Sequence, residues 1–264
     1  MTRFLVVMCG AIAMTATAMV MAGTNAKPAG SLTAAQIIDK NVAARGGLEA
    51  WRAVGTLAMS GQMEAGGKKN SELPFVMRMK RPHMNRLEIR FKNQTAVQVY
   101  DGSHGWKIRP FLGRNDVEPF SEAEAKEAAA WEELDGPLVD YRSKGTQVML
   151  EGKDSVEGRD AYKLKLTLKN GSERHLWVDA ATFLELKIEG QPRKMDGKWH
   201  DVAIFLRDYK KEGGLMMPHE FETVVEGVRE GHKMRIERVS VNPPLDNNLF
   251  TKPQPMLAQS TLVP

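Results

Sequence analysis

The chain has 264 residues, with 37 Lys and Arg against 33 Asp and Glu, and 42% of its residues are hydrophobic. Because residues 1–26 contain one basic residue and no acidic one, residues 27–264 hold 36 Lys and Arg against 33 Asp and Glu. The surplus of three positive charges is small, and positive and negative residues alternate along the chain. This pattern is typical of a solvated surface, so we expect no nucleic-acid interface. The single cysteine, Cys9, precedes residue 27, so the rest of the chain forms no disulfide and no cysteine metal site.

The first 26 residues have the pattern of a secretory signal peptide. Arg3 precedes an apolar run over 4–23, and small residues suited to cleavage follow. The run is also long enough to span a membrane, so an uncleaved anchor is the alternative. Its many Ala, Gly and Thr residues and the Pro28 beyond it favour removal. We therefore expect a cleaved signal peptide over 1–26 and a single exported domain over 27–264.

Helical periodicity occurs in two regions. Residues 33–54 have apolar residues at helical spacing, and Thr33 can cap the helix that they form. The pair Gly46-Gly47 should divide this helix into two pieces. Residues 121–131 form an Ala-rich helix, with Ser121 as its cap.

Apolar and polar residues alternate through most of the remaining chain, which predicts strands. The pattern is clearest over 161–189, where Asn170-Gly171 marks a hairpin turn. In the last strand the apolar phase slips between Ile236 and Val239, which predicts a β-bulge. The predicted strands cover 57–64, 73–81, 86–92, 96–100, 106–108, 145–154, 159–169, 172–179, 182–190, 198–209, 215–226 and 230–242.

These elements predict a mainly β fold. We expect a single large curled antiparallel sheet, an unclosed β-barrel of about 11–12 strands, with helices covering the concave face. Because only two helical regions are available as cover, we expect the concave face to enclose a hydrophobic cavity.

The candidate residues of this cavity are apolar residues of the predicted helices and inward strand faces. Methionine is flexible and polarisable, which suits a pocket for disordered chains of variable length, but ordinary core packing is the alternative for each methionine and each tryptophan. Trp177 and Trp199 are further candidates for the cavity or its rim. The candidate lining residues are Trp51, Leu57, Met59, Phe75, Met77, Met79, Leu87, Ile89, Phe91, Trp106, Trp131, Leu164, Leu166, Leu186, Ile188 and Met234.

No catalytic, metal-binding or cofactor-binding motif stands out. The six histidines are scattered singly, without the H-E-x-x-H spacing of a zinc protease. The segment 102–105 lacks the spacing of a serine-hydrolase nucleophile elbow, and the Gly-Gly pairs have the pattern of turns. We therefore expect no enzymatic activity, no catalytic residue, no metal and no cofactor.

Short segments along nearly the whole chain resemble periplasmic proteins of the outer-membrane lipoprotein-sorting, LolA/LolB-like superfamily. The resemblance implies an unclosed antiparallel β-barrel with helices over a hydrophobic cavity that holds acyl chains of a lipoprotein or another lipid. The segments are ARGGLEAW at 44–51, TLAMSG at 56–61, YDG at 100–102 with Trp106 and Pro110, DGPLVDY at 135–141, GRDAYKL at 158–164, DY at 208–209 with Gly214 and Pro218, and VNPPLD at 241–246 with Phe250.

The function implied by this resemblance is that of a periplasmic carrier, which would take lipid or lipoprotein acyl chains from an inner-membrane donor toward an outer-membrane acceptor. We further expect a monomer. Because release from a carrier needs an opening of the cavity, we expect a helix such as 121–131 to act as a movable lid. One alternative is a binding module that senses a lipid or lipoprotein without transporting it and acts through a protein partner. Another is a structural or enzymatic protein with a solid core.

Overall fold

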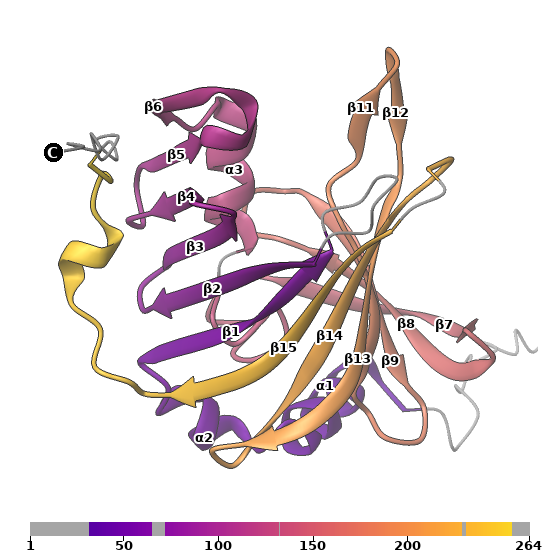
Figure 1. The fold of residues 1–264 in the computed structure, drawn as a ribbon. Coiled ribbons are helices and arrows are strands. Elements are labelled where there is room, and N and C mark those ends of the chain that lie inside the picture. The colour runs from indigo at the N-terminus through magenta and orange to yellow at the C-terminus, as the bar shows by residue number, and fades with distance from the viewer. Residues whose placement is uncertain (1–31, 65–71, 132, 229–230, 255–264) are drawn as a thin grey trace, which may run out of the picture. The chain divides into compact units, whose positions relative to one another are not determined.

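The structure is a computed structural model, which describes residues 32–254 except 65–71, 132 and 229–230. The fold is mainly β. The expected signal peptide over 1–26 lies outside the described residues. In the described part of the chain, thirteen strands form one antiparallel sheet in the order β6-β5-β4-β3-β2-β1-β15-β14-β13-β10-β9-β8-β7 (Figure 1). The edge strands β6 and β7 do not pair with each other, so the sheet is not closed into a barrel. The expected fold class is confirmed.

The strands of this sheet are β1 (Thr56–Glu64), β2 (Glu72–Lys80), β3 (Met84–Phe91), β4 (Gln94–Tyr100), β5 (Gly105–Arg109), β6 (Arg114–Pro119), β7 (Gln147–Val156), β8 (Arg159–Thr167), β9 (Glu173–Asp179), β10 (Glu185–Glu189), β13 (Val202–Glu212), β14 (Leu215–Val225) and β15 (His232–Val241). A separate hairpin consists of β11 (Arg193–Met195) and β12 (Lys198–His200).

The helices begin and end where the sequence predicts. Helix α1 (Ala34–Ala44) starts at a capping box, in which the Gln36 N–H donates to Thr33 Oγ1 at 3.2 Å and the Thr33 N–H to Gln36 Oε1 at 2.9 Å. Helix α2 (Leu48–Arg52) follows Gly46 and Gly47, both at positive φ. A Cβ at Gly46 would lie 2.7 Å from the carbonyl oxygen of Gly214, so the close approach of these segments also requires glycine.

The described residues contain three further helical pieces. Helix α3 (Glu122–Trp131) is capped by Ser121, whose Oγ accepts a hydrogen bond from the Glu124 N–H at 3.3 Å. The two short 3₁₀ helices are η1 (Pro110–Leu112) and η2 (Asn247–Phe250). Among the described residues, no helix is long and apolar enough to cross a membrane.

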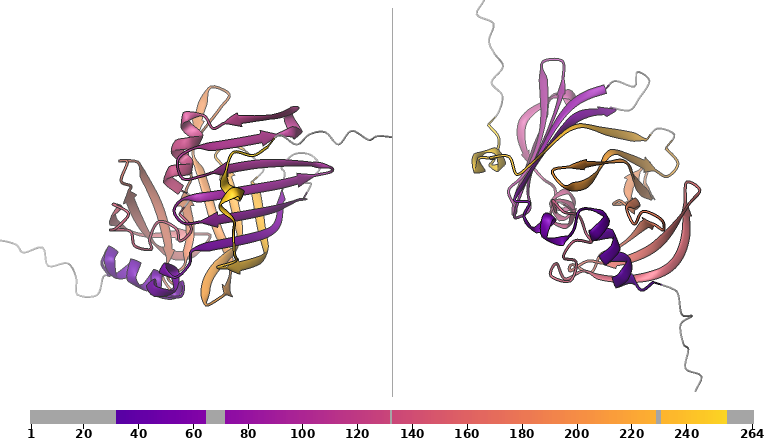
Figure 2. Two further views of the ribbon diagram at one scale, coloured as in Figure 1. Left: turned by 90° about the vertical axis from the view of Figure 1, so that its left-hand side faces the viewer. Right: turned by 90° about the horizontal axis from the view of Figure 1, so that it is seen from below.

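The main core lies on the face of the sheet that we call the inner face, which carries Leu57 and Met59 of β1. Side chains of β1, β2, β8, β9, β10, β14 and β15 pack there against α1, α2 and residues 134–139. Helices α1 and α2 lie at one end of the curled sheet, below the strands in the view of Figure 1 and in front of them in the right-hand view of Figure 2. The helices therefore cover only part of the inner face.

The outer face is also partly covered. The chain beyond β15 runs across β1, β2 and β3, where Thr56 Oγ1, Lys80 Nζ and Arg86 Nη1 donate to carbonyl oxygens of residues 243, 245 and 249. A second, smaller cluster on the outer face contains Val156, Ala161, Trp177 and Leu186.

The predicted bulge in the last strand is confirmed. In the pairing of β1 with β15, Ser60 lies opposite Arg238 and Gly61 opposite Ile236, so Glu237 is the extra residue. A Cβ at Gly61 would lie 1.9 Å from the carbonyl oxygen of Arg235. The bulge therefore depends on a glycine in the facing strand.

The prediction of one strand over 198–209 is wrong. Asp196 and Gly197 form a turn at positive φ, and β11 pairs with β12 in a hairpin that projects from the large sheet (Figure 1). Trp199 is 70% exposed on this hairpin, so the structure does not place it at a cavity. The short strand β6 was also missed, because residues 114–119 lack an apolar alternation.

Candidate functional site

An apolar cavity of about 360 Å³ lies inside the curled sheet. This volume is within the range of about 300–1,000 Å³ that is usual for ligand pockets. The wall comes from β1, β2, β9, β10, β13, β14 and β15, together with α2 and residues 133–137. The candidate lining residues that the structure brings together here are Trp51, Leu57, Met59, Phe75, Met77, Met79, Ile188 and Met234.

Further lining residues follow the same alternation on strands that the candidate residues did not include. Ile204 and Leu206 lie on β13, and Met217 and Phe221 lie on β14. Each pair is separated by an even number of positions, so the strand period places both members on one face. The alternation of apolar and polar residues that places these four residues on the inner face was present in the sequence.

Of five further candidate residues, four belong to the main core or pack against it. Leu87 and Ile89 of β3 are partly buried and pack against the main core, while Leu164 and Leu166 of β8 are fully buried within it. Phe91 is 36% exposed at the end of β3, where its ring packs edge-to-face against Phe111 with the ring centroids 5.5 Å apart. None of the five lines the apolar cavity.

Two candidate residues are placed on the outer face. In the strand pairings, Trp106 lies opposite Val99, and Val99 lies opposite Arg86. Arg86 is next to Leu87, which points to the inner face, so Arg86, Val99 and Trp106 all point to the outer face. Leu186 belongs to the outer cluster, because a bulge between Glu185 and Lys187 shifts the phase of β10 so that Glu185 and Ile188 point inward.

Two tryptophans remain to be placed. Trp177 belongs to the same outer cluster as Leu186, so the structure does not place it at the cavity or its rim. Trp131 ends α3, and its side chain lies outside the described part of the structure.

One end of the cavity is polar, which the sequence did not indicate. Arg45 Nη1 lies 3.3 Å from Glu185 Oε1 and donates to the carbonyl oxygen of Asp135 at 2.8 Å. The hydroxyl of Tyr209 donates to Glu185 Oε2 at 3.1 Å and lies 3.0 Å from the Glu185 carbonyl oxygen. Burial, and then the charge of Glu185, raise the pKa of Tyr209 well above its ordinary value, so this hydroxyl stays protonated at neutral pH.

Ion pairs fix the segment 133–137 that borders the cavity. The carboxylate of Asp135, only 2% exposed, accepts hydrogen bonds from Arg81 at 2.7 Å and from Lys144 at 2.6 Å. Lys144 also pairs with Glu133 and donates to the carbonyl oxygen of Gly136. Because both acids have cationic partners, this buried network leaves no isolated charge against the apolar lining.

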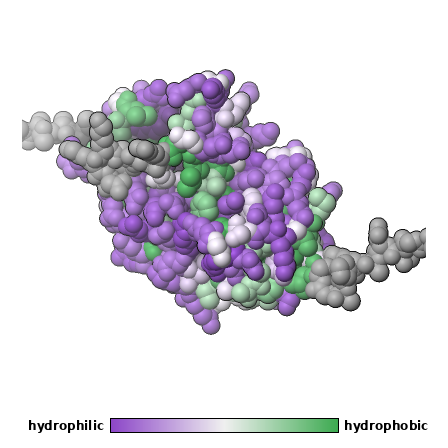
Figure 3. Space-filling view, turned by 90° about the vertical axis from the view of Figure 1, so that its right-hand side faces the viewer, coloured by the Kyte–Doolittle hydropathy of each residue, from purple (hydrophilic) through white to green (hydrophobic). Residues whose placement is uncertain are grey.

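A second pocket, of about 810 Å³, adjoins the apolar cavity and shares Glu133, Gly136 and Pro137 with it. The other side chains around this second pocket are mostly polar or cationic, and they come from α3, β8, β9, the loops between these elements and the turn between β2 and β3. On the face shown in Figure 3, hydrophobic residues form a recessed strip between two largely hydrophilic regions.

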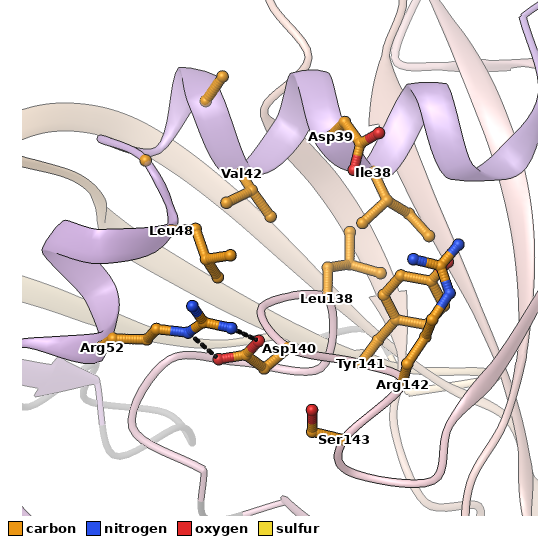
Figure 4. A pocket seen from close by; sticks show the side chains of 12 residues that line it. Ile38, Asp39, Val42, Leu48, Arg52, Leu138, Asp140, Tyr141, Arg142 and Ser143 are labelled. Atoms are coloured by element: carbon orange, nitrogen blue, oxygen red, sulfur yellow. Dashed lines mark hydrogen bonds and ion pairs between the residues drawn. The ribbon is translucent and has the colours of Figure 1, made fainter.

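A third pocket, of about 450 Å³, is a groove between α1, α2 and residues 138–143 (Figure 4). Ile38 and Val42 of α1 face Leu138 across it, and Arg52 forms two hydrogen bonds with Asp140, at 2.9 and 2.8 Å. The hydrogen bond with Arg52 lowers the pKa of Asp140 below its ordinary value.

Among the described residues, no three or more His, Cys, Asp or Glu side chains form a group that could hold a metal ion.

Solved structures with this fold are known. The chain aligns over 84% of its length with 99% of a LolA superfamily protein from Nitrosomonas europaea, at 15% identity and a TM-score of 0.54. It aligns over 82% with 95% of a protein domain assigned to outer-membrane lipoprotein sorting from Vibrio parahaemolyticus, at 15% identity and a TM-score of 0.53. A DUF1329 family protein from Desulfovibrio piger gives 15% identity and a TM-score of 0.52, over 81% of this chain and 95% of that one.

No protein-family model and no curated protein matches the chain. The three structures show that the chain has the fold found in LolA superfamily proteins, so the fold expected from the sequence resemblance is confirmed.

Proposed function

We propose that this protein is a periplasmic carrier, which binds acyl chains of a lipoprotein or another lipid in the apolar cavity for transport toward the outer membrane. The observation that carries the proposal is the cavity itself, whose wall is mostly Leu, Ile, Met and Phe. Support also comes from the fold, because one protein of similar fold belongs to the LolA superfamily and another is assigned to lipoprotein sorting.

The cavity has room for one acyl chain. A cavity of about 150 Å³ holds a benzene molecule, or about 25 Å³ per carbon atom. On that scale, 360 Å³ corresponds to a chain of about 14 carbons. Burial of about 14 methylenes contributes about 11 kcal/mol before the costs of association, so binding without a covalent bond would be firm.

The methionines give this lining the adaptability that a carrier needs. Met59, Met77, Met79, Met217 and Met234 all border the cavity. Their unbranched side chains change rotamer at little cost and can fit chains of different length or unsaturation. The polar side chains of Arg45, Glu185 and Tyr209 are ion-paired or hydrogen-bonded to one another. We therefore assign them a role in stabilising the shape of the cavity rather than in catalysis.

The test is mass spectrometry of organic extracts from protein purified from the periplasm without detergent. We expect a lipid or acylated peptide at about one per protein, and an N-terminus at or near residue 27. Transfer of that lipid between donor and acceptor vesicles would then distinguish a carrier from a sensing module. An empty extract, together with no uptake of a hydrophobic dye by the purified protein, would refute the proposal.

A further inference from the structure

The hairpin of β11 and β12 presents apolar and cationic side chains together to solvent. Trp199 is 70% exposed and Met195 is 38% exposed, so two large apolar groups lie on one short projecting segment. Residues 193–199 also carry three exposed cations and one anion, Asp196. The three cations, which have no ion-pair partner among the described residues, are Arg193, Lys194 and Lys198.

The strand pairing places a cation beside each large apolar side chain. Lys194 lies opposite Trp199, and Lys198 lies opposite Met195. Residues directly opposite each other in an antiparallel pair share one face, with their Cβ atoms about 5 Å apart. Because successive residues alternate between faces, each face of the hairpin combines an apolar group with an ammonium group. This combination is typical of the boundary between water and a lipid bilayer, where an indole ring lies among the headgroups and cations meet anionic lipids.

The hairpin continues two strands that line the apolar cavity. Strand β10 ends at Glu189, one residue after Ile188, and β13 begins at Val202, two residues before Ile204. Both isoleucines border the cavity. The Gly190 N–H donates to the Val202 carbonyl oxygen at 2.8 Å, which holds the base of the hairpin on the sheet. The hairpin therefore projects directly from one end of the cavity wall.

That end of the cavity is the more exposed one. Tyr209 marks the polar end and lies seven residues beyond Val202 along β13, or about 20 Å at the rise of a strand. Trp51 at the polar end is buried, whereas Ile204 and Phe221, nearer to the hairpin, are only partly buried. In Figure 1 the hairpin projects at the end of the sheet opposite α1 and α2.

We infer that this hairpin docks the protein on an anionic membrane, with Trp199 among the lipid headgroups and the three exposed cations against lipid phosphates. An anionic bilayer fits both features, since it supplies the missing negative charge and removes apolar surface from water. Docking in this orientation brings the more exposed end of the cavity toward the bilayer. The inference goes beyond the proposed carrier function, because the hairpin binds a membrane whether or not the cavity holds a lipid.

The experiment measures cosedimentation of the purified protein with vesicles. Equal parts of phosphatidylcholine and phosphatidylglycerol form the anionic surface, and phosphatidylcholine alone forms the neutral one. We expect much tighter binding to the anionic vesicles at low salt. The variant Lys194→Gln/Lys198→Gln should bind them roughly tenfold or more weakly, since each cation near such a surface contributes about fivefold. The matched control, Lys153→Gln/Lys211→Gln, removes two exposed lysines elsewhere and should bind as the unmodified protein.

The role of the indole ring is tested separately. Trp199→Ala should bind the anionic vesicles about tenfold more weakly, because the lost ring no longer leaves water on docking. Leu112→Ala is its control, since Leu112 is 66% exposed on η1, away from the hairpin. All variants share one N-terminus, so the apolar run over 4–23 cannot cause a difference between them.

Unchanged binding of both hairpin variants would overturn the inference, and so would equal binding of the protein to anionic and neutral vesicles. No binding to either vesicle would also overturn it and would direct the search for the hairpin's partner to proteins. None of these results touches the carrier proposal, because uptake of a hydrophobic dye is measured without vesicles. Conversely, hairpin-dependent vesicle binding by a protein that takes up no dye and yields an empty extract would support the docking surface and refute the carrier alone.

Discussion

The guanidinium of Arg45 lies over the indole ring of Trp51, 4.4 Å from the ring centroid, and the indole N–H donates to the carbonyl oxygen of Arg45 at 3.0 Å. Both residues are buried, at 7% and 0% exposed. The turn at Gly46 and Gly47 brings them together, so the end of α1 and the helix α2 form one unit. This contact holds the charge of Arg45 toward Glu185 at the end of the cavity.

Removal of one partner of the buried ion pair should be strongly destabilising. In Arg45→Met, Glu185 loses its cationic partner in the interior and retains only the Tyr209 hydroxyl as its hydrogen-bond donor. We expect the free energy of unfolding to fall by about 3 kcal/mol or more, measured by urea denaturation. The double variant Arg45→Met/Glu185→Met should be less destabilised than the sum of the single variants, and strict additivity would contradict the pairing.

A charge on the cavity wall should prevent lipid uptake. Met77 of β2 borders the cavity, so Met77→Asp places a carboxylate where an acyl chain would lie. We expect hydrophobic-dye uptake to fall at least tenfold in the folded variant. Ala58→Asp is the matched control, because Ala58 lies on the outer face opposite Arg78. Unchanged uptake by a folded Met77→Asp variant would contradict the assignment of this wall.

Acid should weaken the fold partly through Asp179, which is 3% exposed. Burial raises the pKa of Asp179, but hydrogen bonds from the backbone and hydroxyl of Thr182, at 2.6 and 2.8 Å, and the charge of Arg159 lower it by more. The pKa of Asp179 in the folded state therefore lies below its ordinary value. Because the folded protein binds this proton less readily than the unfolded chain, the stabilisation is present above about pH 4 and is lost as the pH falls further.

The variant Asp179→Asn isolates that contribution, since asparagine keeps an acceptor oxygen for Thr182 but does not titrate in this range. Urea midpoints measured from pH 7 to pH 3 should fall more steeply for the unmodified protein than for the variant. Parallel curves would mean that the charge of Asp179 adds nothing to stability.

The bulge in β15 makes Gly61 sensitive to substitution. In Gly61→Ala, the new Cβ would lie 1.9 Å from the carbonyl oxygen of Arg235, and the backbone must shift to admit it. We expect a loss of about 3 kcal/mol in the free energy of unfolding, seen as a lower melting temperature. In Gly55→Ala the nearest atom is Asn242 Oδ1, 3.9 Å from the new Cβ, so this control should change stability by less than about 1 kcal/mol.

Much of the fold could be predicted from local patterns. The cap at Thr33 and the glycines at 46 and 47 mark the helix boundaries that the structure has. The phase slip between Ile236 and Val239 locates the bulge in β15. These features depend on neighbours within a few residues, which is why the sequence contains them.

The candidate cavity could be predicted only in part. Met59 and Met77 border it because each lies on the apolar face of its own strand. Leu186 continues an apolar alternation in the sequence, yet the bulge in β10 turns it to the outer face and brings Glu185 inward. Trp106 lies on the outer face because its strand register pairs it with Val99. A strand pattern gives two faces but does not give the register that decides which face is inside.

The sequence by itself determined the mainly β architecture, the helix boundaries and the apolar faces of most strands, since these follow from steric and solvation preferences over short stretches. Only the tertiary structure decided that Arg45 meets Glu185 and that Lys126, Lys169 and Arg174 surround one pocket. Those groups lie far apart in the chain, and long-range strand pairing and sheet curvature bring them together. An isolated charge in the sequence does not indicate which opposite charge or ligand it will meet.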